Sequence, residues 1–288
     1  MASPQDGQTA AWAAVAHVAA AAVGGPLPPG VRVTVNFHPD RPAGGGRLVL
    51  DAMAADGRYR SQFETGTSNG GLTAHPGGDR WAWESRLFGG AYDTAPPEQR
   101  PTYGALNFRR RPVGGSPRFG SAHLRLTADT LTRATFCYPD SHLLRHPVLP
   151  HHIGVAARMD LIALAEADDQ DLLDDYIEAH LHGPLSLDRD VEAVVLDPCY
   201  RDTAVERAAQ GLGCAVEWHP GYRLTAADLG RHRDYRGPAA VDLAVALTDG
   251  GHLDPGVIGD AARTGDHDDQ DLKRVWHLLA RFGRPTTR

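Results

Sequence analysis

The stretch that decides the fold is Tyr176–Asp197, YIEAHLHGPLSLDRDVEAVVLD, in which two apolar, alternating segments flank a Gly-Pro turn. Alternation with a period of two is typical of β-strands, because successive side chains point to opposite faces of a sheet. Glu178, His180 and His182 therefore share one face of the first strand, and a face of that composition is not a core face. A carboxylate is expensive to bury without a partner, so Glu178 is the first candidate functional residue, with Glu192 in the next strand as the reserve.

The segments around this stretch predict an α+β protein with helices at both ends. Glycine and proline concentrate between positions 24 and 120, which indicates short strands joined by turns. The expected strands are residues 31–38, 59–64, 103–108, 121–126, 135–138 and 214–218. The expected helices are an alanine-rich opening helix, then residues 48–55, 159–177, 203–210, 241–248 and 270–282.

Composition excludes several classes of protein. The chain has 288 residues, 42% of them hydrophobic and 23% charged, as in ordinary globular proteins. A net charge of −7 argues against a general nucleic-acid surface, and no apolar run is long enough to predict a membrane span. The 3 cysteines are widely spaced and form no CxxC pair. This favours a reducing, cytoplasmic location and argues against both a disulfide scaffold and a cysteine zinc site.

Polar residues cluster in the first half of the chain. His38 follows an alternating strand and precedes a proline, so its side chain could point into a cleft. Arg60 and Gln62 would share one polar face of the expected strand 59–64. A Gly-rich loop then offers backbone and hydroxyl groups that would suit a pyrophosphate or an amide, from Thr67, Ser68 and Asn69. An equally ordinary explanation is a turn whose polar side chains form hydrogen bonds with the backbone of the turn itself.

Two later strands carry polar pairs with the same alternation. Tyr103 and Asn107 lie in YGALN, and Ser121 and His123 lie in FGSAH. The members of each pair face the same side of a strand. Tyr103 offers a ring that could stack on a flat ligand, although a tyrosine in a sheet is often only a packing residue.

Taken together, these segments resemble an uncharacterised bacterial family defined by a domain of unknown function. The resemblance runs through almost the whole chain, in the segments VNFHPDR, YRSQFETGTSNGG, RWAWESRLFGGAYD, YGALN, GGSPRFGSAHL, FCYPDS, YIEAHLHGPLSL, EWHPGYRL and DYRGP. By itself it implies no activity.

A weaker resemblance is to the ADP-ribosyltransferase superfamily, with its diphtheria-toxin-like branch favoured. His38 on the first strand, Tyr103 (or Ser121) in the middle and Glu178 late in the chain follow that superfamily's order of active-site residues. The resemblance implies a split, strongly bent β-sandwich core with flanking terminal helices. The chain departs from the pattern because no HGT, STS or QxE motif is intact, and Arg60 could be the first-strand residue of the other branch.

The same resemblance implies the domains and the chemistry. We expect an N-terminal helix in residues 1–30, a catalytic α+β domain in 31–240, and a helical appendage in 241–288 packed on it. The substrate would be NAD, cleaved at the nicotinamide–ribose bond by transfer of ADP-ribose to an unknown acceptor or to water, with no metal. The catalytic residues would be Glu178, His38 and Tyr103. NAD would be bound by Arg60, Gln62, Thr67, Ser68, Asn69, Asn107, Ser121, His123 and His180.

Two other functions stay open. A metal-dependent hydrolase is conceivable because the chain has 15 histidines, which are good zinc ligands, although no HExxH spacing occurs. The third possibility is a non-enzymatic nucleotide- or partner-binding protein with a degenerate transferase fold, in which His180 stands where an acid would be expected.

Overall fold

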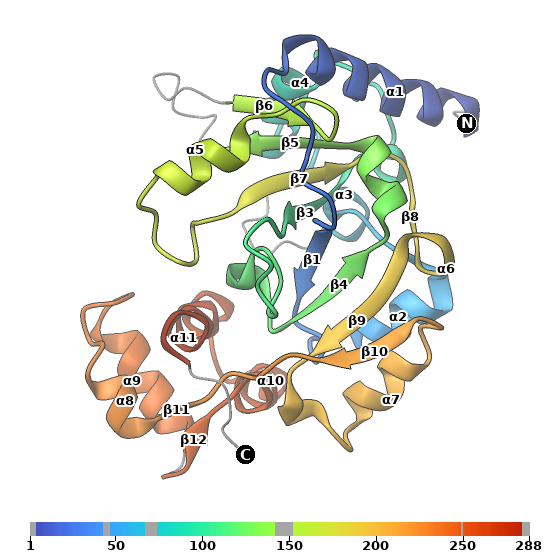
Figure 1. The fold of residues 1–288 in the computed structure, drawn as a ribbon. Helices are drawn as coiled ribbons and strands as arrows, with labels where there is room; N and C mark the ends of the chain where they lie inside the picture. The colour runs from blue at the N-terminus through green and yellow to red at the C-terminus, as the bar shows by residue number, and fades with distance from the viewer. Residues whose placement is uncertain (1–3, 43–46, 67–73, 142–151, 249, 284–288) are drawn as a thin grey trace.

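The computed structural model describes residues 4–42, 47–66, 74–141, 152–248 and 250–283, and an eight-stranded sheet forms its centre (Figure 1). In order across the sheet, the strands are β10 (Ala215–Trp218), β9 (Val191–Leu196), β4 (Ala122–Leu126), β1 (Val33–Phe37), β3 (Thr102–Leu106), β7 (Ile177–Leu181), β5 (Ala134–Tyr138) and β6 (His152–Val155). Neighbouring strands are antiparallel except β9 and β10, which are parallel. The chain is therefore an α+β protein built on a large mixed sheet.

One face of this sheet is apolar and carries the main hydrophobic core. Val33, Val35 and Phe37 of β1 point to it, as do the alternate residues of the neighbouring strands. Three helices cover it, α2 (Val49–Asp56), α5 (Leu161–Ala167) and α7 (Ala204–Gln210), whose apolar residues belong to the same core. Removal of these side chains from water is the main source of the sheet's stability.

The opposite face is unusually hydrophilic for the interior of a protein, and we call it the polar face. Strand register places on it the side chains of Thr34, Asn36, Tyr103, His123, Arg125, Thr135, Cys137, Glu178 and His180. Near β5 this face is covered by α1 (Pro4–Ala21) and α4 (Asp79–Leu87), and Ala14, Val18 and Leu87 form a small core there with Cys137. Tyr103, Glu178 and His180 thus lie on the part of the polar face that these helices cover.

The backbone of residues 113–116, the Gly114 loop, lies across the middle of the polar face. Thr34 Oγ1 accepts a hydrogen bond from Gly115 N at 2.8 Å, and Asn36 Nδ2 donates to Val113 O at 2.9 Å. A Cβ at Gly114 would stand 2.5 Å from Asn36 Oδ1, and the φ of Gly114 is +88°. Only glycine allows both the close approach and this backbone conformation, so the GGSP segment forms a partition across the polar face.

The C-terminal part has its own hydrophobic core, whose buried residues run from Tyr222 to Ala280 and include Leu173 from the turns before β7. It contains β11 (Leu224–Thr225), α8 (Ala226–Gly230), α9 (Pro238–Leu247), β12 (His252–Leu253), α10 (Pro255–Thr264) and α11 (Asp269–Phe282). The side chain of Trp276 on α11 donates to the carbonyls of Pro117 and Arg118, both at 3.1 Å. These bonds fasten the helical part to the turn between β3 and β4, beside which α11 lies in Figure 1.

The remaining elements are short. They are β2 (Arg58–Tyr59), α3 (Gln62–Thr65), β8 (Leu185–Ser186), α6 (Leu187–Asp190) and the 3₁₀ turns Pro97–Gln99, Pro117–Phe119, Ala128–Arg133 and Pro198–Tyr200. β2 and β8 pair with each other outside the large sheet.

Most of the predicted elements are confirmed, and two are wrong. Residues 59–64 do not form a strand: Ser61 caps the helix α3, with Glu64 bonded back to the Ser61 amide at 2.8 Å. The helix expected over 159–177 ends at Ala167, and the acidic residues after it form turns before β7. Asp171 there accepts from the Leu173 amide, a local bond that competes with helix formation.

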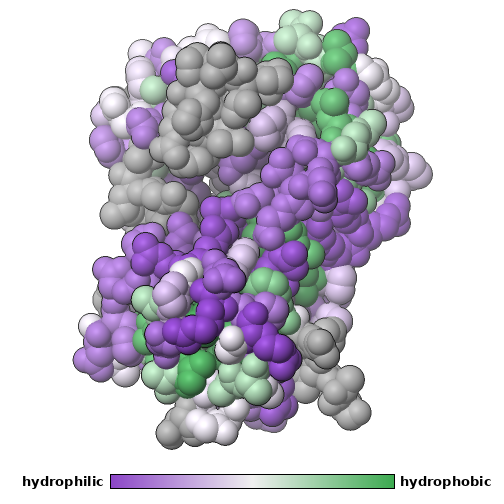
Figure 2. Space-filling view, turned by 90° about the vertical axis from the view of Figure 1, so that its left-hand side faces the viewer, coloured by the Kyte–Doolittle hydropathy of each residue, from purple (hydrophilic) through white to green (hydrophobic). Residues whose placement is uncertain are grey.

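Among the described residues, no helix combines the length and the apolar character that a membrane span requires. Figure 2 shows hydrophilic residues over most of the visible surface, with hydrophobic residues in small patches between them.

Candidate functional site

The structure brings three of the predicted site residues together on the polar face, in neighbouring strands. Tyr103 of β3 is the cross-strand partner of His180 on β7, and their rings meet edge to face with centroids 5.2 Å apart. Glu178 lies two residues from His180 on the same face and is 7% exposed. We call this group, with the residues that contact it, the Glu178 centre.

The Glu178 carboxylate is held by a short hydrogen bond. His180 Nε2 lies 2.7 Å from Glu178 Oε1, and the Cys137 thiol of β5 is 4.0 Å from the same oxygen. Burial alone would raise the pKa of Glu178, but the hydrogen bond and charge of His180 lower it to about 2. The side chain is therefore a buried carboxylate that is ionised at neutral pH, with its orientation fixed by the histidine.

A chain of buried hydrogen bonds continues from His180. Thr135 Oγ1 lies 3.1 Å from His180 Nδ1 and 2.9 Å from His182 Nε2, and His182 Nδ1 lies 2.8 Å from the Tyr92 hydroxyl. Burial lowers the pKa of His182 well below its usual value, so this imidazole is neutral. A carboxylate only accepts, and a neutral imidazole has one donor and one acceptor. Thr135 Oγ1 therefore accepts from one imidazole and donates to the other, which links His182 and Tyr92 to the pair formed by His180 and Glu178.

The other side of the Glu178 centre is built by α4. The Tyr103 hydroxyl donates to Glu84 Oε1 at 2.8 Å, and Arg100 Nη1 donates to Glu84 Oε2 at 2.6 Å. Burial raises the pKa of Glu84 to about 7, although the charge of Arg100 opposes the shift. The Arg80 guanidinium stacks over the Tyr103 ring at 4.3 Å. A cation, an ionised carboxylate and an acid that titrates near neutrality therefore adjoin one tyrosine.

Arg80 is the most informative residue that the sequence analysis missed. It is 8% exposed, yet Nε and Nη1 have no hydrogen-bond partner among the described residues. Buried donors are nearly always paired, so such atoms indicate a ligand or a catalytic role. Arg80 and Glu84 are one helical turn apart on α4, which directs both toward the sheet.

Three further predicted residues lie elsewhere on or beside the polar face. The His38 ring meets Trp276 edge to face with centroids 4.9 Å apart, and desolvation there lowers its pKa to about 3. Ser121 Oγ is 3.2 Å from the Tyr200 hydroxyl. Asn107 closes a turn by bonding both the amide and the carbonyl of Arg111.

Two residues predicted from RYRSQFETGTSNGG, Arg60 and Gln62, do not join this group. Arg60 pairs with Asp56 on the surface, 2.7 Å from its carboxylate, and Gln62 begins α3. Thr67, Ser68 and Asn69 lie outside the described residues. Glu192, the reserve carboxylate, forms ion pairs with Arg32 at 2.8 Å and Arg125 at 3.1 Å.

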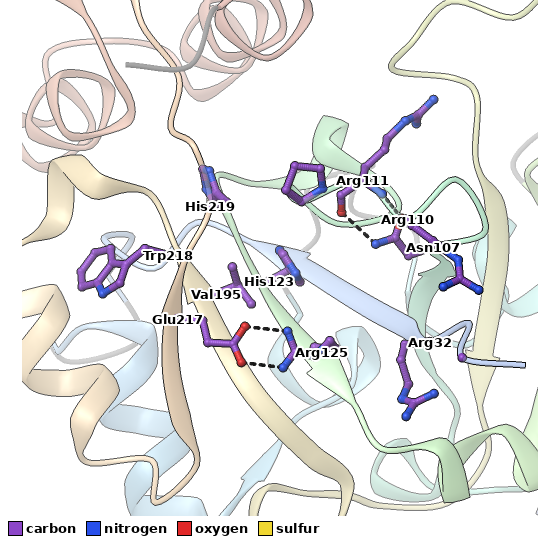
Figure 3. A pocket seen from close by; sticks show the side chains of 12 residues that line it. Arg32, Asn107, Arg110, Arg111, His123, Arg125, Val195, Glu217, Trp218 and His219 are labelled. Carbon is purple, nitrogen blue, oxygen red and sulfur yellow. Dashed lines mark hydrogen bonds and ion pairs between the residues drawn. The ribbon is translucent and has the colours of Figure 1, made fainter. Parts of the chain in front are cut away.

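Asn107 and His123 instead line a second feature, a pocket of about 380 Å³ (Figure 3). We call it the arginine pocket. Its lining residues are Gly30, Arg32, Asn107, Arg110, Arg111, Pro112, His123, Arg125, Val195, Glu217, Trp218 and His219. Within the polar face it lies toward β9 and β10, whereas the Glu178 centre lies toward β5 and β7.

The Glu178 centre also contains a set of possible metal ligands. Cys137 Sγ, one carboxylate oxygen of Glu178 and one ring nitrogen of His180 all lie within 4.8 Å of one another, and all three residues are buried. Thiolate, imidazole and carboxylate are the ligands that zinc prefers. Burial raises the pKa of the Cys137 thiol, so an ion would have to displace its proton.

Comparison with known proteins identifies the family but no activity. None of the curated proteins compared with the chain matches it. One family profile, described as a protein of unknown function (DUF3626), matches residues 32–148 and 143–282, which include the sheet, both groups of polar residues and most of the C-terminal helices. The chain is a member of this DUF3626 family.

Proposed function

We propose that the protein cleaves the nicotinamide–ribose bond of NAD at the Glu178 centre, as an ADP-ribosyltransferase or an NAD glycohydrolase. The observation that carries the proposal is a buried, ionised carboxylate held by His180 beside Tyr103 and beside the unpaired donors of Arg80. His38 is kept in the proposed site as the residue that would hold the adenosine ribose.

The chemistry fits this set of groups. Breaking the C–N bond leaves positive charge on the ribose ring, as in glycoside hydrolysis, while the bond's electron pair leaves with nicotinamide. The Glu178 carboxylate would stabilise that charge, and the Tyr103 ring would pack on the nicotinamide. Arg80 would neutralise the pyrophosphate, the role predicted for Arg60, because a planar guanidinium matches phosphate oxygens.

The shape of the sheet adds support for a transferase-like, split core. β1 and β3 pair at two positions, Val33 with Leu106 and Thr34 with Ala105. A Cβ at Gly104 would lie 2.7 Å from Thr34 O, so the strands cross closely there. Beyond that point Asn36 bonds the Gly114 loop. Pairing limited to two positions between the first and middle strands is compatible with a split, bent core.

The decisive experiment is release of nicotinamide from NAD by the purified full chain. Glu178→Gln keeps the size of the side chain and removes its charge, so we expect a fall of about 10²–10³-fold, as for loss of one preorganised electrostatic group. Glu192→Gln is the matched control, because it removes a carboxylate from a neighbouring part of the same sheet. Absence of release by the unmodified protein, or equal release by both variants, would refute the proposal.

A metal-dependent hydrolase is the second candidate, favoured by the Cys137, Glu178 and His180 ligand set. Elemental analysis of the purified protein, before and after dialysis against a chelator, separates the two candidates. Stoichiometric zinc that is lost in Cys137→Ser, with no nicotinamide release, would favour the hydrolase.

A further inference from the structure

The arginine pocket has more positive than negative charge in its walls. Glu192 is shared by Arg32 and Arg125, and Glu217 receives two bonds from Arg125, at 2.6 and 2.7 Å. Arg110 has no carboxylate partner among the described residues, since its side-chain bond goes to the Pro29 carbonyl at 2.9 Å. Arg110 therefore contributes an uncompensated cation to the pocket.

Arg111 also lines the pocket, but its guanidinium is bonded to Asp175, which does not line it. Asp175 also takes an ion pair from Arg109. Two guanidinium groups thus share one carboxylate there, which leaves the wall formed by residues 109–111 positive overall.

The pocket also contains a buried nitrogen without a partner. His123 is 3% exposed, and its Nδ1 has no hydrogen-bond partner among the described residues. Burial lowers the pKa of His123 to about 3, so the ring is neutral and Nδ1 can carry a proton or accept one. The neighbouring His219 differs, because its Nε2 donates to Ser121 O at 2.7 Å and its Nδ1 accepts from Gly221 N at 3.0 Å.

An unpaired buried nitrogen destabilises the folded chain, so a ligand atom that bonded it would remove that cost. Figure 3 shows His123 and Arg125 between the walls that carry Arg110 and Glu217. An oxyanion in the pocket would therefore accept from the arginines, and from His123 Nδ1–H once the ring turns toward it, because that nitrogen has almost no accessible surface in the structure. Phosphate is the anion best matched to several guanidinium groups, because it offers oxygens in several directions.

We infer that the arginine pocket is a binding site for a phosphate-bearing small molecule, distinct from the Glu178 centre. A volume of about 380 Å³ is at the lower end of ordinary ligand pockets, which suits a compact molecule such as a sugar phosphate or a mononucleotide. The inference does not depend on NAD cleavage, because the Gly114 loop lies across the polar face between the two groups of residues.

The test is isothermal titration of the full chain with inorganic pyrophosphate and with AMP at low salt. We expect saturable binding that Arg110→Ala weakens at least tenfold and that Arg110→Lys partly restores. His123→Leu should weaken it as well, because the donor is lost while the ring's space is filled. Arg233→Ala is the control, since Arg233 is an exposed arginine paired with Asp242 on α9.

Circular dichroism establishes that each variant is folded before titration. Affinity that is the same in Arg110→Ala, His123→Leu and the unmodified protein would overturn the inference. So would an equal loss in Arg233→Ala, which would mean that the anions bind to surface charge in general. Unchanged binding in Glu178→Gln is expected, and loss there would mean that the anions bind at the Glu178 centre instead.

Discussion

Among the described residues, Thr135 supplies the hydroxyl that links the two buried histidines beside Glu178, and its removal gives a quantitative test of the hydrogen-bond chain. Thr135→Val keeps the shape of the side chain but removes the hydroxyl that lies 3.1 Å from His180 Nδ1 and 2.9 Å from His182 Nε2. Both histidines are essentially unexposed, at 0% and 1%. Water therefore cannot replace the lost partner.

Each nitrogen left unpaired in the core costs about 1–3 kcal/mol, so we expect Thr135→Val to lower the free energy of unfolding by about 2–6 kcal/mol. That is a large part of the stability of an ordinary domain. Thr135→Ser retains the hydroxyl and loses one methyl, which costs about 1 kcal/mol. The valine variant should therefore be much less stable than the serine variant, although it is closer to threonine in volume.

The assay is urea denaturation followed by circular dichroism, with the slope of the transition compared among the variants. Thr132→Val is the matched control, because the Thr132 hydroxyl makes one exposed bond, to the Asp129 carbonyl at 2.7 Å. We expect that change to cost under about 0.5 kcal/mol. A Thr135→Val protein as stable as Thr135→Ser would refute the chain of bonds.

Three further predictions concern individual groups. Burial lowers the pKa of His38, His123 and His277 to about 3 and that of His182 below its usual value, so below pH 6.5 the unfolded chain binds more protons; Glu84, whose pKa is raised to about 7, opposes the trend. Unfolding free energy measured in urea should therefore fall by about 4 kcal/mol per pH unit as pH falls below 6.5, and a flat profile would contradict it. Gly120→Ala should cost more than about 3 kcal/mol, because its Cβ would stand 2.1 Å from the Phe37 carbonyl carbon, whereas Gly230→Ala, with no atom within 4 Å, should be neutral in the same assay. Finally, Arg80→Gln should raise the KM for NAD at least about tenfold with a smaller change in kcat, since pyrophosphate is bound equally in ground and transition states. A KM that rises in Arg60→Gln but not in Arg80→Gln would mean that Arg60 binds NAD, as predicted from the sequence.

The alternation of YIEAHLH was sufficient to place Glu178, His180 and His182 on one face of a strand, because a strand's period of two is a local property. The sequence also predicted that Tyr103 lies in a strand with Asn107, another polar residue, on the same face. The pairing of Tyr103 with His180 was not readable, because register between strands far apart in sequence depends on the whole sheet.

The error at residues 59–64 has a local cause that could have been recognised. Ser61 and Glu64 have the S-x-x-E spacing of a capping box, and in the structure both reciprocal bonds are present. The alternation in YRSQFE predicts a strand. In the structure a four-residue helix forms instead, and its capping residues Ser61 and Glu64 bond the backbone amides at its start. Arg60 consequently points toward Asp56 rather than along a polar strand face.

Arg80 and Glu84 were missed for a different reason. Residues of opposite charge one turn apart on a helix are normally expected on its solvent face, where they form an ion pair that stabilises the helix. Here α4 turns that pair toward the sheet, and Trp83 and Leu87 are buried with it. Only the tertiary arrangement, with Arg100 and Tyr103 as partners, shows that the pair belongs to the interior.

The metal alternative makes one more prediction, which concerns protons. A metal on His180 Nε2 would leave the proton of that ring on Nδ1, and the hydrogen bonds through Thr135 and His182 would then run toward Tyr92. An imidazole bound to a metal keeps one proton, so the thiol of Cys137 is the ligand that must lose a proton to solvent.

Zinc titration in two buffers of different ionisation enthalpy should therefore show release of about one proton per ion at pH 7.5. Cys137→Ser should bind zinc more weakly and release none. Binding without proton release, or equal binding by Cys137→Ser, would mean that the thiol is not a ligand and would remove the metal alternative. Because zinc and the NAD ribose would both require the Glu178 carboxylate, zinc bound there should also inhibit nicotinamide release, so one titration bears on both candidate functions.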